Sequence, residues 1–371
     1  VNAELNKRTD LATAWVANNG SNEGNSNTSR VTSADLKTVS DLLKSKFIYK
    51  QGQSLTMRAT IGKEEVRRTY SLCSSPLENE WKVAIKKVEG GSFSTFANLS
   101  LKKGDMLDVM QPVGKFYVEL DPVNKKNYLA FAAGSGITPL LSIIKTTLQT
   151  EPQSSFTLVY GNKSRSSIIF FEELEGLKNK YLQRFNFINI LSRERTDAPI
   201  NFGRINMEKL IELSKLINYS SIDETFICGP EEMIFTVKEF LEQKGIDKKN
   251  IHFELFTTPG QKKSEVRIQK SEINSGPKST ITVKLDGRSF AFDLSLTSDT
   301  SILDAALQQG ADLPFACKGG VCCTCKAKLL EGEVSMDVHW GLEDEEVEQG
   351  YILTCQSHPK TEKVVVDFDV K

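Results

Sequence analysis

The residues with the clearest chemistry are four cysteines near the C-terminal end of the chain. Three of them form the run Cys317-x4-Cys322-x2-Cys325, and Cys355 follows further along. Four thiolates in this C-x4-C-x2-C…C spacing hold a [2Fe–2S] cluster, a centre that carries one electron at a time. A Gly-Gly pair inside the run suits a tight loop, because glycine adopts backbone angles that side chains forbid. The spacing therefore predicts an electron carrier with these four cysteines as metal ligands.

Other uses of the cysteines fit less well. A zinc knuckle usually has two short Cys/His pairs, whereas here the first gap is four residues and the fourth ligand stands alone. Disulfides are disfavoured because the chain has seven cysteines and no segment ordered like a secretory signal. Cys323 lies between two ligands, and we expect it to be a small packed residue rather than a fifth ligand.

Length and composition exclude several classes of protein. A chain of 371 residues predicts two to three domains, each able to bury its own core. The net charge of −1 gives no sign of nucleic-acid binding. No stretch approaches the roughly 18 uninterrupted apolar residues of a membrane span. We therefore expect a soluble protein of a reducing compartment, the cytoplasm.

Residues 1–122 are predicted to form an antiparallel β-barrel domain. Alternating apolar and polar runs, punctuated by glycine, are typical of antiparallel strands. The first 35 residues are atypical, and residues 18–29 are so polar and low in complexity that they predict a flexible loop. Strands are expected at 54–61, 67–72, 81–88 and 106–110, with weaker candidates near 11–17 and 30–36.

The rest of the chain predicts two further domains. In residues 123–258 apolar strands alternate with helical stretches, the βαβ rhythm of a parallel sheet. Residues 259–279 are rich in Lys, Ser, Gly and Pro and predict a linker. Residues 280–371 begin with two alternating strands and a helix near 301–309, followed by the cysteine loop. The parallel strands are expected at 128–133, 156–160, 185–191, 225–228 and 252–256.

Two turns at strand ends predict a nucleotide site. Residues 133–139, Ala-Gly-Ser-Gly-Ile-Thr-Pro, follow an apolar strand and open an apolar helix at 140–148. Glycines let a phosphate approach the backbone, and a helix N-terminus supplies free N–H groups and a positive dipole end. Cys228-Gly229-Pro230 ends another strand of the same predicted sheet, and ligands of such sheets bind at the carboxyl ends of strands. Cys228 could equally be a small buried hydrophobic residue.

An arginine near these turns is a candidate for nucleotide selection. Ser192 and Arg193 follow the predicted strand 185–191. A bidentate contact from Arg193 could bind the 2′-phosphate of NADP. A merely solvated arginine explains the residue nearly as well, and Arg165 is a weaker second candidate.

Polar residues in the β region suggest a place for a flavin. Arg68 and Tyr70 are two residues apart and share one face of a strand, with Ser71 on the other face. They would offer a cation to a pyrophosphate and an aromatic plane to a flavin, although an ordinary amphipathic strand is the alternative. The run Gly90-Gly91-Ser92-Phe93-Ser94-Thr95 offers a small-residue turn suited to diphosphate.

Taken together, residues 47–371 resemble the ferredoxin–NADP reductase superfamily with a plant-type ferredoxin domain, an α+β fold of the β-grasp type, fused at the C-terminus. The resemblance implies catalytic positions at Ser71, Cys228 and Glu254. It implies FAD binding by Arg68, Tyr70, Ser71, Ser74, Gly91, Ser94 and Phe256. It implies NADPH binding by Gly134, Gly136, Thr138, Pro139, Ser192, Arg193, Cys228, Gly229 and Pro230.

The resemblance also implies an activity, an NAD(P)H-dependent flavin and iron–sulfur oxidoreductase that serves a monooxygenase system. Electrons would pass from NADPH, or NADH, to FAD, then to the cluster, then to a partner oxygenase. The domain order and the cysteine run are most similar to reductase components of phenylacetyl-CoA epoxidase, whose partner in phenylacetate catabolism is a separate di-iron oxygenase. A fatty-acyl desaturase or a ring-hydroxylating oxygenase is an alternative acceptor, and a redox-sensing iron–sulfur flavoprotein is the non-enzymatic alternative.

One segment is a candidate for docking the partner. Residues 331–349 carry eight acidic side chains and no lysine or arginine. Such a surface could dock a basic face of the oxygenase. A solvated acidic helix face is the commoner explanation of a charge run.

Overall fold

The computed structural model describes residues 11–17, 28–33, 48–102, 105–256 and 277–370. Most of the loop predicted at 18–29 and of the linker predicted at 259–279 lies outside these residues. The chain divides into two compact units, one made mainly of Leu11–Val66 and Tyr70–Leu255, the other mainly of Phe256–Lys371. Within the described part of the chain, no helix has both the length and the apolar character needed to cross a membrane. The domain limits given above stay a prediction.

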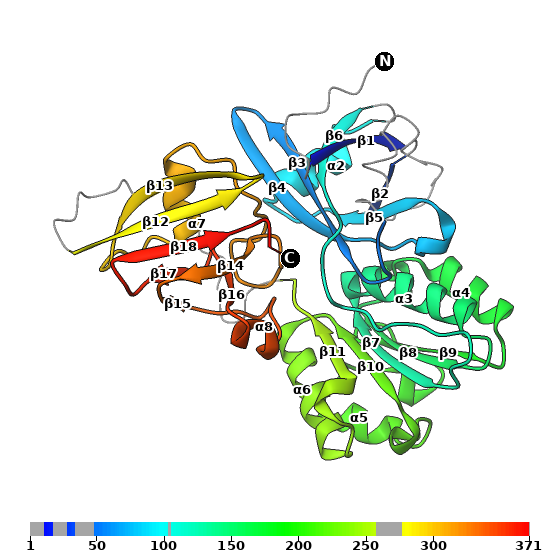
Figure 1. Cartoon of the computed structure of the whole chain (residues 1–371). Coiled ribbons are helices and arrows are strands. Elements are labelled where there is room, and N and C mark those ends of the chain that lie inside the picture. Colours follow the sequence, from blue (N-terminus) through cyan, green and yellow to red (C-terminus); the bar gives the residue numbers. More distant parts are fainter. Residues whose placement is uncertain (1–10, 18–27, 34–47, 103–104, 257–276, 371) are drawn as a thin grey trace. The chain divides into compact units, whose positions relative to one another are not determined.

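Six antiparallel strands form the first sheet, in the order β4-β3-β6-β1-β2-β5 (Figure 1). A bridge between Leu72, just after β4, and Val83 of β5 joins the two ends of this order, so the sheet closes into the predicted barrel. Helix α2 (Ser92–Leu99) covers it and was not predicted. The strands are β1 (Leu11–Ala17), β2 (Thr28–Ser33), β3 (Ser54–Ile61), β4 (Glu64–Ser71), β5 (Trp81–Lys86) and β6 (Met106–Met110).

Five parallel strands form the second sheet, in the order β11-β10-β7-β8-β9. Helices α3 and α4 cover one face and α5 and α6 the other, as Figure 1 shows. The predicted α/β architecture is confirmed. The strands are β7 (Asn127–Ala133), β8 (Ser155–Asn162), β9 (Phe185–Leu191), β10 (Glu224–Cys228) and β11 (Ile251–Glu254), and the helices are α3 (Ile137–Thr150), α4 (Phe171–Lys180), α5 (Met207–Leu213) and α6 (Glu231–Gln243).

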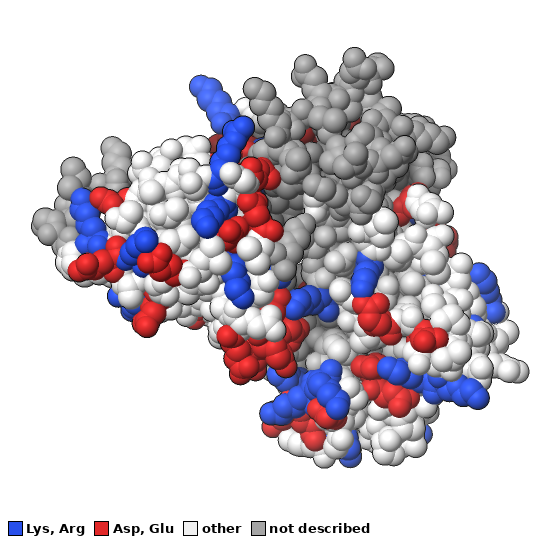
Figure 2. Space-filling model, viewed as in Figure 1, with Lys and Arg blue, Asp and Glu red and all other residues white. Residues whose placement is uncertain are grey.

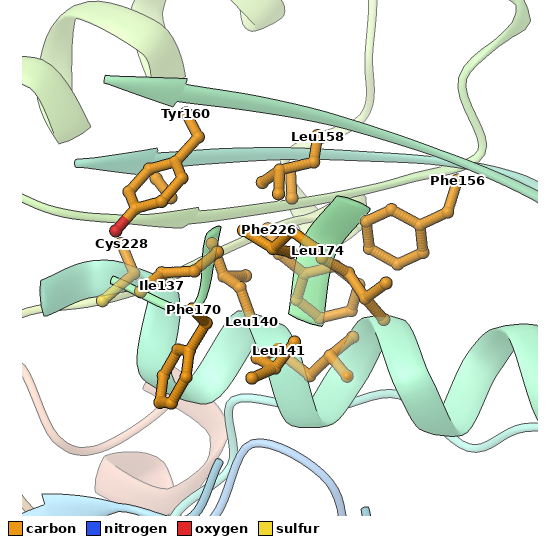
Figure 3. Packing of buried hydrophobic residues seen from close by; sticks show 14 of the residues in the cluster. Ile137, Leu140, Leu141, Phe156, Leu158, Tyr160, Phe170, Leu174, Phe226 and Cys228 are labelled. Atoms are coloured by element: carbon orange, nitrogen blue, oxygen red, sulfur yellow. The ribbon is translucent and has the colours of Figure 1, made fainter. Parts of the chain in front are cut away.

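Helix α3 packs on the sheet through fully buried aliphatic residues such as Ile137, Leu140 and Leu141 (Figure 3). They meet Phe156 and Phe226 from the strands. Cys73, from the segment that follows β4 of the barrel, belongs to the same buried cluster. The barrel and the parallel sheet therefore share part of one core.

The second unit is the predicted α+β ferredoxin fold. Its mixed sheet has the order β13-β12-β18-β14-β16, with a parallel pair only between β12 and β18 among the described strands. Helix α7 (Ile302–Gln308) packs on it, while the small hairpin β15/β17 and helix α8 (Asp344–Glu348) were not predicted. The strands are β12 (Lys278–Leu285), β13 (Arg288–Ser295), β14 (Lys326–Glu331), β15 (Val334–Met336), β16 (Tyr351–Leu353), β17 (Ser357–Pro359) and β18 (Lys363–Asp367).

Candidate functional site

The register of two paired strands places two of the predicted cluster ligands. Lys326 of β14 lies opposite Leu353 of β16, so Cys325 ends one strand close to where Cys355 follows the other. Between them, the backbone N–H and the hydroxyl of Thr354 both donate to the carbonyl oxygen of Cys325, at 3.2 and 3.0 Å. The sheet therefore fixes this half of the ligand set before the loop supplies the other half.

The four sulfurs converge. Hydrogen bonds from Cys322 and then Cys355 lower the pKa of the Cys317 thiol to about 2. The same contacts, together with burial, raise the pKa values of Cys322 and Cys355, and Cys355 also bonds with Cys325. Such mutual contacts show four thiols gathered round one small space.

The donors in this space fit a two-iron cluster. The backbone N–H of Gly319 points at the sulfur of Cys317, at 3.3 Å, and N–H donors to sulfur favour the thiolate form. Among the described residues, no three His, Cys, Asp or Glu side chains surround the position of a single metal ion. Each iron of a [2Fe–2S] cluster takes two cysteines, so the four thiols match the ligand set of that cluster.

A second loop, residues 337–342, covers the cysteine loop. The backbone N–H of Gly341 donates to the Gly320 carbonyl at 2.9 Å, and the thiol of Cys323 donates to the Gly341 carbonyl at 2.7 Å. A Cβ at Gly341 would lie 3.0 Å from the backbone of Cys322, and Gly320 adopts φ +71°. The Cys323 thiol therefore supports the loop, and its exclusion from the ligand set stays a prediction. The cysteine spacing gave no indication that Gly341 packs against the cysteine loop.

The two predicted nucleotide turns lie side by side at the carboxyl ends of adjacent strands. A Cβ at Gly136 would come within 2.0 Å of the Cys228 carbonyl oxygen, so only glycine allows this approach. The buried hydroxyl of Tyr160 donates to the Gly134 carbonyl at 2.8 Å and holds the turn, a contact the sequence did not reveal. No described atom lies within 4 Å of where a Cβ would stand at Gly134, so that side of the turn is open.

Polar residues from both turns complete the start of their helices. The hydroxyl of Thr138 donates to the Ser135 carbonyl at 3.0 Å. Pro139 lies in the first turn of α3, and Pro230 is the N-cap of α6. Gly229 approaches Met233 so closely that a Cβ would lie 2.6 Å from its methyl group. This arrangement offers two helix starts at one sheet edge to a phosphate.

The arginines predicted to select the nucleotide lie at the ends of β8 and β9. Arg193 is exposed, and its backbone N–H donates to the Lys163 carbonyl at 2.8 Å, which pairs the two loops. The guanidinium of Arg165 stacks on the ring of Phe171, 4.8 Å from its centroid. The backbone N–H of Arg165 donates to the Glu194 carboxylate at 2.8 Å. The side chain of Arg193 is therefore exposed, whereas the guanidinium of Arg165 stacks on an aromatic ring.

In the barrel, strand β4 presents the predicted flavin residues with the expected alternation. Arg68 is exposed, Tyr70 is half-buried and Ser71 is buried. The Tyr70 ring lies 5.7 Å from that of Phe93 in α2, which fixes its plane. An aromatic face beside an exposed arginine fits the isoalloxazine and pyrophosphate of a flavin nucleotide.

The two other serines predicted for FAD bond within the protein. Ser74 is fully buried, and its hydroxyl bonds with that of Tyr49 at 2.8 Å. The Ser94 hydroxyl accepts from the Val88 N–H at 3.1 Å, and a Cβ at Gly91 would lie 2.6 Å from it. Both hydroxyls therefore shape the backbone here. Their contact with FAD stays a prediction.

The three predicted catalytic residues come together from three strands. The Ser71 hydroxyl donates to the Glu254 carboxyl at 3.2 Å. Cys228 is the register partner of Glu254 in the parallel pair β10–β11. Burial raises the pKa of Glu254 to about 8 against the opposing hydrogen bond from Ser71, and burial followed by the charge of Glu254 raises the pKa of Cys228. Phe256, two residues on, is exposed.

Known protein families match the chain in the order of its domains. An oxidoreductase FAD-binding domain matches residues 26–117, an oxidoreductase NAD-binding domain 131–239, and a 2Fe-2S iron-sulfur cluster binding domain 284–360. The chain is 48% identical over 331 residues to one of the subunits of 1,2-phenylacetyl-CoA epoxidase from Escherichia coli, covering 89% of this chain and 91% of that protein. The chain belongs to the ferredoxin–NADP reductase superfamily, in the branch with a C-terminal iron–sulfur domain.

Other members of the superfamily are more distant. The ferredoxin reductase component of 3-ketosteroid-9-alpha-monooxygenase from Rhodococcus rhodochrous is 33% identical over 335 residues, covering 89% of this chain and 91% of that one. The solved structure of phthalate dioxygenase reductase has a TM-score of 0.57 at 21% identity and covers 96% of this chain and 98% of that one, which shows a shared fold. The protein is thus an NAD(P)H-dependent oxidoreductase with FAD, NAD and [2Fe–2S] domains.

Adjacent cysteines give a matched test of the metal ligands. We expect Cys322→Ser to lose the cluster, because an iron then lacks one of its two thiolates. Cys323→Ser should keep it, since that side chain donates to a carbonyl. Iron and sulfide content and the visible spectrum after anaerobic reconstitution measure both. Equal cluster content in the two variants would contradict the assignment.

Glu254 predicts a pH dependence of stability. Its pKa is raised from 4.5 to about 8, so between these values the folded protein holds a proton that the unfolded chain does not. The stability contributed by this group therefore falls as pH rises through the window and levels off above pH 8. The melting temperature of Glu254→Gln relative to wild type should rise across the same window. A pH-independent difference for Glu254→Gln would refute the raised pKa.

Proposed function

We propose that the protein takes electrons from NADPH and delivers them one at a time to the di-iron oxygenase of a phenylacetyl-CoA epoxidase system. The observation that carries the electron path is the meeting of Ser71 from the barrel with Cys228 and Glu254 from the nucleotide sheet. It supports a site where a flavin on β4 faces a nicotinamide at the carboxyl edge of the parallel strands. The high identity to a component of an epoxidase supports the choice of acceptor.

FAD, when bound, supplies the conversion between a two-electron hydride and the single electrons that a cluster accepts. Arg68 and Tyr70 bind and orient it in our proposal, and the turns at 134–136 and 228–230 hold the nucleotide. The Ser71 hydroxyl donates a hydrogen bond to Glu254, whose pKa of about 8 keeps a proton on that carboxyl at neutral pH. A neutral carboxyl adds no negative charge beside a group that gains electrons.

The small, uncharged side chain of Cys228 fits the nicotinamide pocket. It is fully buried, and its raised pKa keeps the thiol protonated. It would therefore shape the pocket without competing as a nucleophile. Because all seven cysteines lie in the described part of the chain as thiols and not as disulfides, we further propose that the protein works in the cytoplasm, where thiols stay reduced.

We propose NADPH as the donor because of Arg193. Its exposed guanidinium lies at the end of β9, two strands from the glycine turn that follows β7. That is where the ribose of a nucleotide would extend if its pyrophosphate occupied the turn. A guanidinium matches a 2′-phosphate by two parallel hydrogen bonds.

The donor preference is testable by one substitution. Arg193→Ala should raise the KM for NADPH roughly tenfold or more, because a charge-assisted contact of about 1.5–3 kcal/mol is lost. The KM for NADH should stay within about twofold, since NADH has no 2′-phosphate. Arg195→Ala, an exposed neighbour, is the control. An equal loss for both nucleotides would show that Arg193 does not read this phosphate.

For the partner surface, we propose that the oxygenase docks on helix α8. Three acids of the 331–349 segment have partners outside it: Glu331 forms an ion pair with Lys363, Glu346 forms one with Lys326, and Asp337 bonds with the His358 ring. Four exposed acids gather at α8, with Glu343 at its N-cap and Asp344, Glu345 and Glu348 within it, where Figure 2 shows the patch; Glu333, also exposed, precedes β15. The candidate surface is therefore Glu343, Asp344, Glu345 and Glu348 rather than the whole segment.

Electron delivery to the oxygenase tests both the acceptor and the surface. With NADPH, wild type should reduce the phenylacetyl-CoA epoxidase di-iron component and slow as salt rises. Glu345→Lys with Glu348→Lys should slow this step about tenfold at low salt and leave ferricyanide reduction unchanged. The control is Asp293→Lys with Asp299→Lys, because β13 and β16 are opposite edges of the sheet and α8 packs on β16.

The outcomes separate the two proposals. If wild type reduces a ring-hydroxylating oxygenase or a desaturase but not the epoxidase component, the acceptor is wrong. If both double variants slow equally, or rates do not depend on salt, docking on α8 is wrong while the acceptor stands.

A further inference from the structure

One face of helix α3 is polar although it is buried. Ser142, Lys145 and Thr146 follow the i, i+3, i+4 spacing of a single helix face. Ser142 is 0% and Thr146 5% exposed. The helix already packs on the parallel sheet through its aliphatic face, so core packing alone does not call for these polar residues.

The three polar side chains bond to the barrel segment that follows β4. The Ser142 hydroxyl donates to the Ser74 carbonyl at 2.5 Å. The hydroxyls of Thr146 and Ser75 lie 2.8 Å apart. Lys145 forms an ion pair with Glu78. Three successive links thus attach one turn of the helix to one short segment of the barrel.

The directions of these bonds are determined. Thr146 donates its only proton to the Ser142 carbonyl, at 2.7 Å, so Ser75 must be the donor to Thr146. Ser75 also accepts from the Leu77 N–H at 3.2 Å, and its own N–H donates to Glu78 at 3.3 Å. Every polar group of this contact is therefore used, and a small shift would break several bonds together.

The two bonded segments carry the two halves of the reaction site. Ser71 and Tyr70 lie only a few residues before Ser74 in the barrel. Gly136 precedes Ser142 by about 9 Å of helix axis, at 1.5 Å for each residue. A helix is rigid over this length, so the bonds to Ser74, Ser75 and Glu78 fix the phosphate turn relative to the flavin strand.

We propose that Ser142, Lys145 and Thr146 are positioning residues that set the distance between the nicotinamide and the flavin. The inference rests on the proposed function. In that step the C–H bond of the dihydronicotinamide breaks and its electron pair moves with the hydrogen to the flavin, leaving oxidised nicotinamide and reduced flavin. None of the three residues forms a bond to the transferred hydride. A displacement of about 1 Å is enough to slow such a transfer up to a hundredfold.

The test removes hydroxyls without changing shape. In Ser142→Ala with Thr146→Val we expect flavin reduction at saturating NADPH, followed by anaerobic stopped-flow, to slow at least tenfold. FAD content and the dissociation constant of NADP⁺ should stay within about twofold, because neither binding element is altered. Thr146→Val alone keeps the test available if the double variant fails to fold.

Two variants of the same helix serve as controls. Thr146→Ser keeps the hydroxyl and should transfer hydride at nearly the wild-type rate. Thr147→Val removes a buried hydroxyl that has no hydrogen-bond partner in the described structure, and it should also behave as wild type.

Each result is decisive. A lower melting temperature with unchanged hydride transfer would show a structural role only and overturn the inference. A slowing matched by weaker NADP⁺ binding would overturn it as well, because the residues would then act on affinity. If neither NADPH nor NADH reduces the flavin of wild type, the proposed function itself fails and the inference falls with it.

Discussion

The candidate redox site depends on one contact, the packing of the barrel segment after β4 against the nucleotide domain. Cys73 enters the apolar core of that domain. On either side of it, Ser71 bonds to Glu254 and Ser74 accepts a bond from Ser142. Apolar burial draws the two surfaces together but has no direction, whereas hydrogen bonds weaken steeply when misaligned. The core therefore provides the attraction and the flanking polar groups provide the register.

In the iron–sulfur unit, strand pairing and loop contacts likewise have separate roles in placing the cysteines. The pairing of β14 with β16 places Cys325 and Cys355, and backbone contacts with Gly341 hold the loop that carries Cys322. These contacts are all made within the unit. The ligand set is thus preorganised by a sheet and two loops.

Local patterns in the sequence predicted most of the strands, α3, α7 and both glycine turns, because alternation and apolar runs are local signals. Helix α2 was read as a turn, since its Ser, Thr and Phe residues are weak helix formers and two glycines precede it. Helix α8 is short and reads only as an acidic run. The partners of three acids in the 331–349 segment come from β14, β17 and β18, and no charge count within the segment could reveal them.

The polar links of α3 lay beyond such patterns for a related reason. Serine and threonine on an apolar helix usually bond to their own backbone, and only the fold shows that Ser142 bonds to another domain instead. Burial would lower the pKa of Lys145, but hydrogen bonds to Glu173 and Glu78 raise it above its ordinary value, so the cation stays charged. Buried polar groups of this kind add little net stability, because desolvation offsets most of the gain. Their value lies in geometry, since an apolar contact of the same area would hold the two domains together but leave them free to slide.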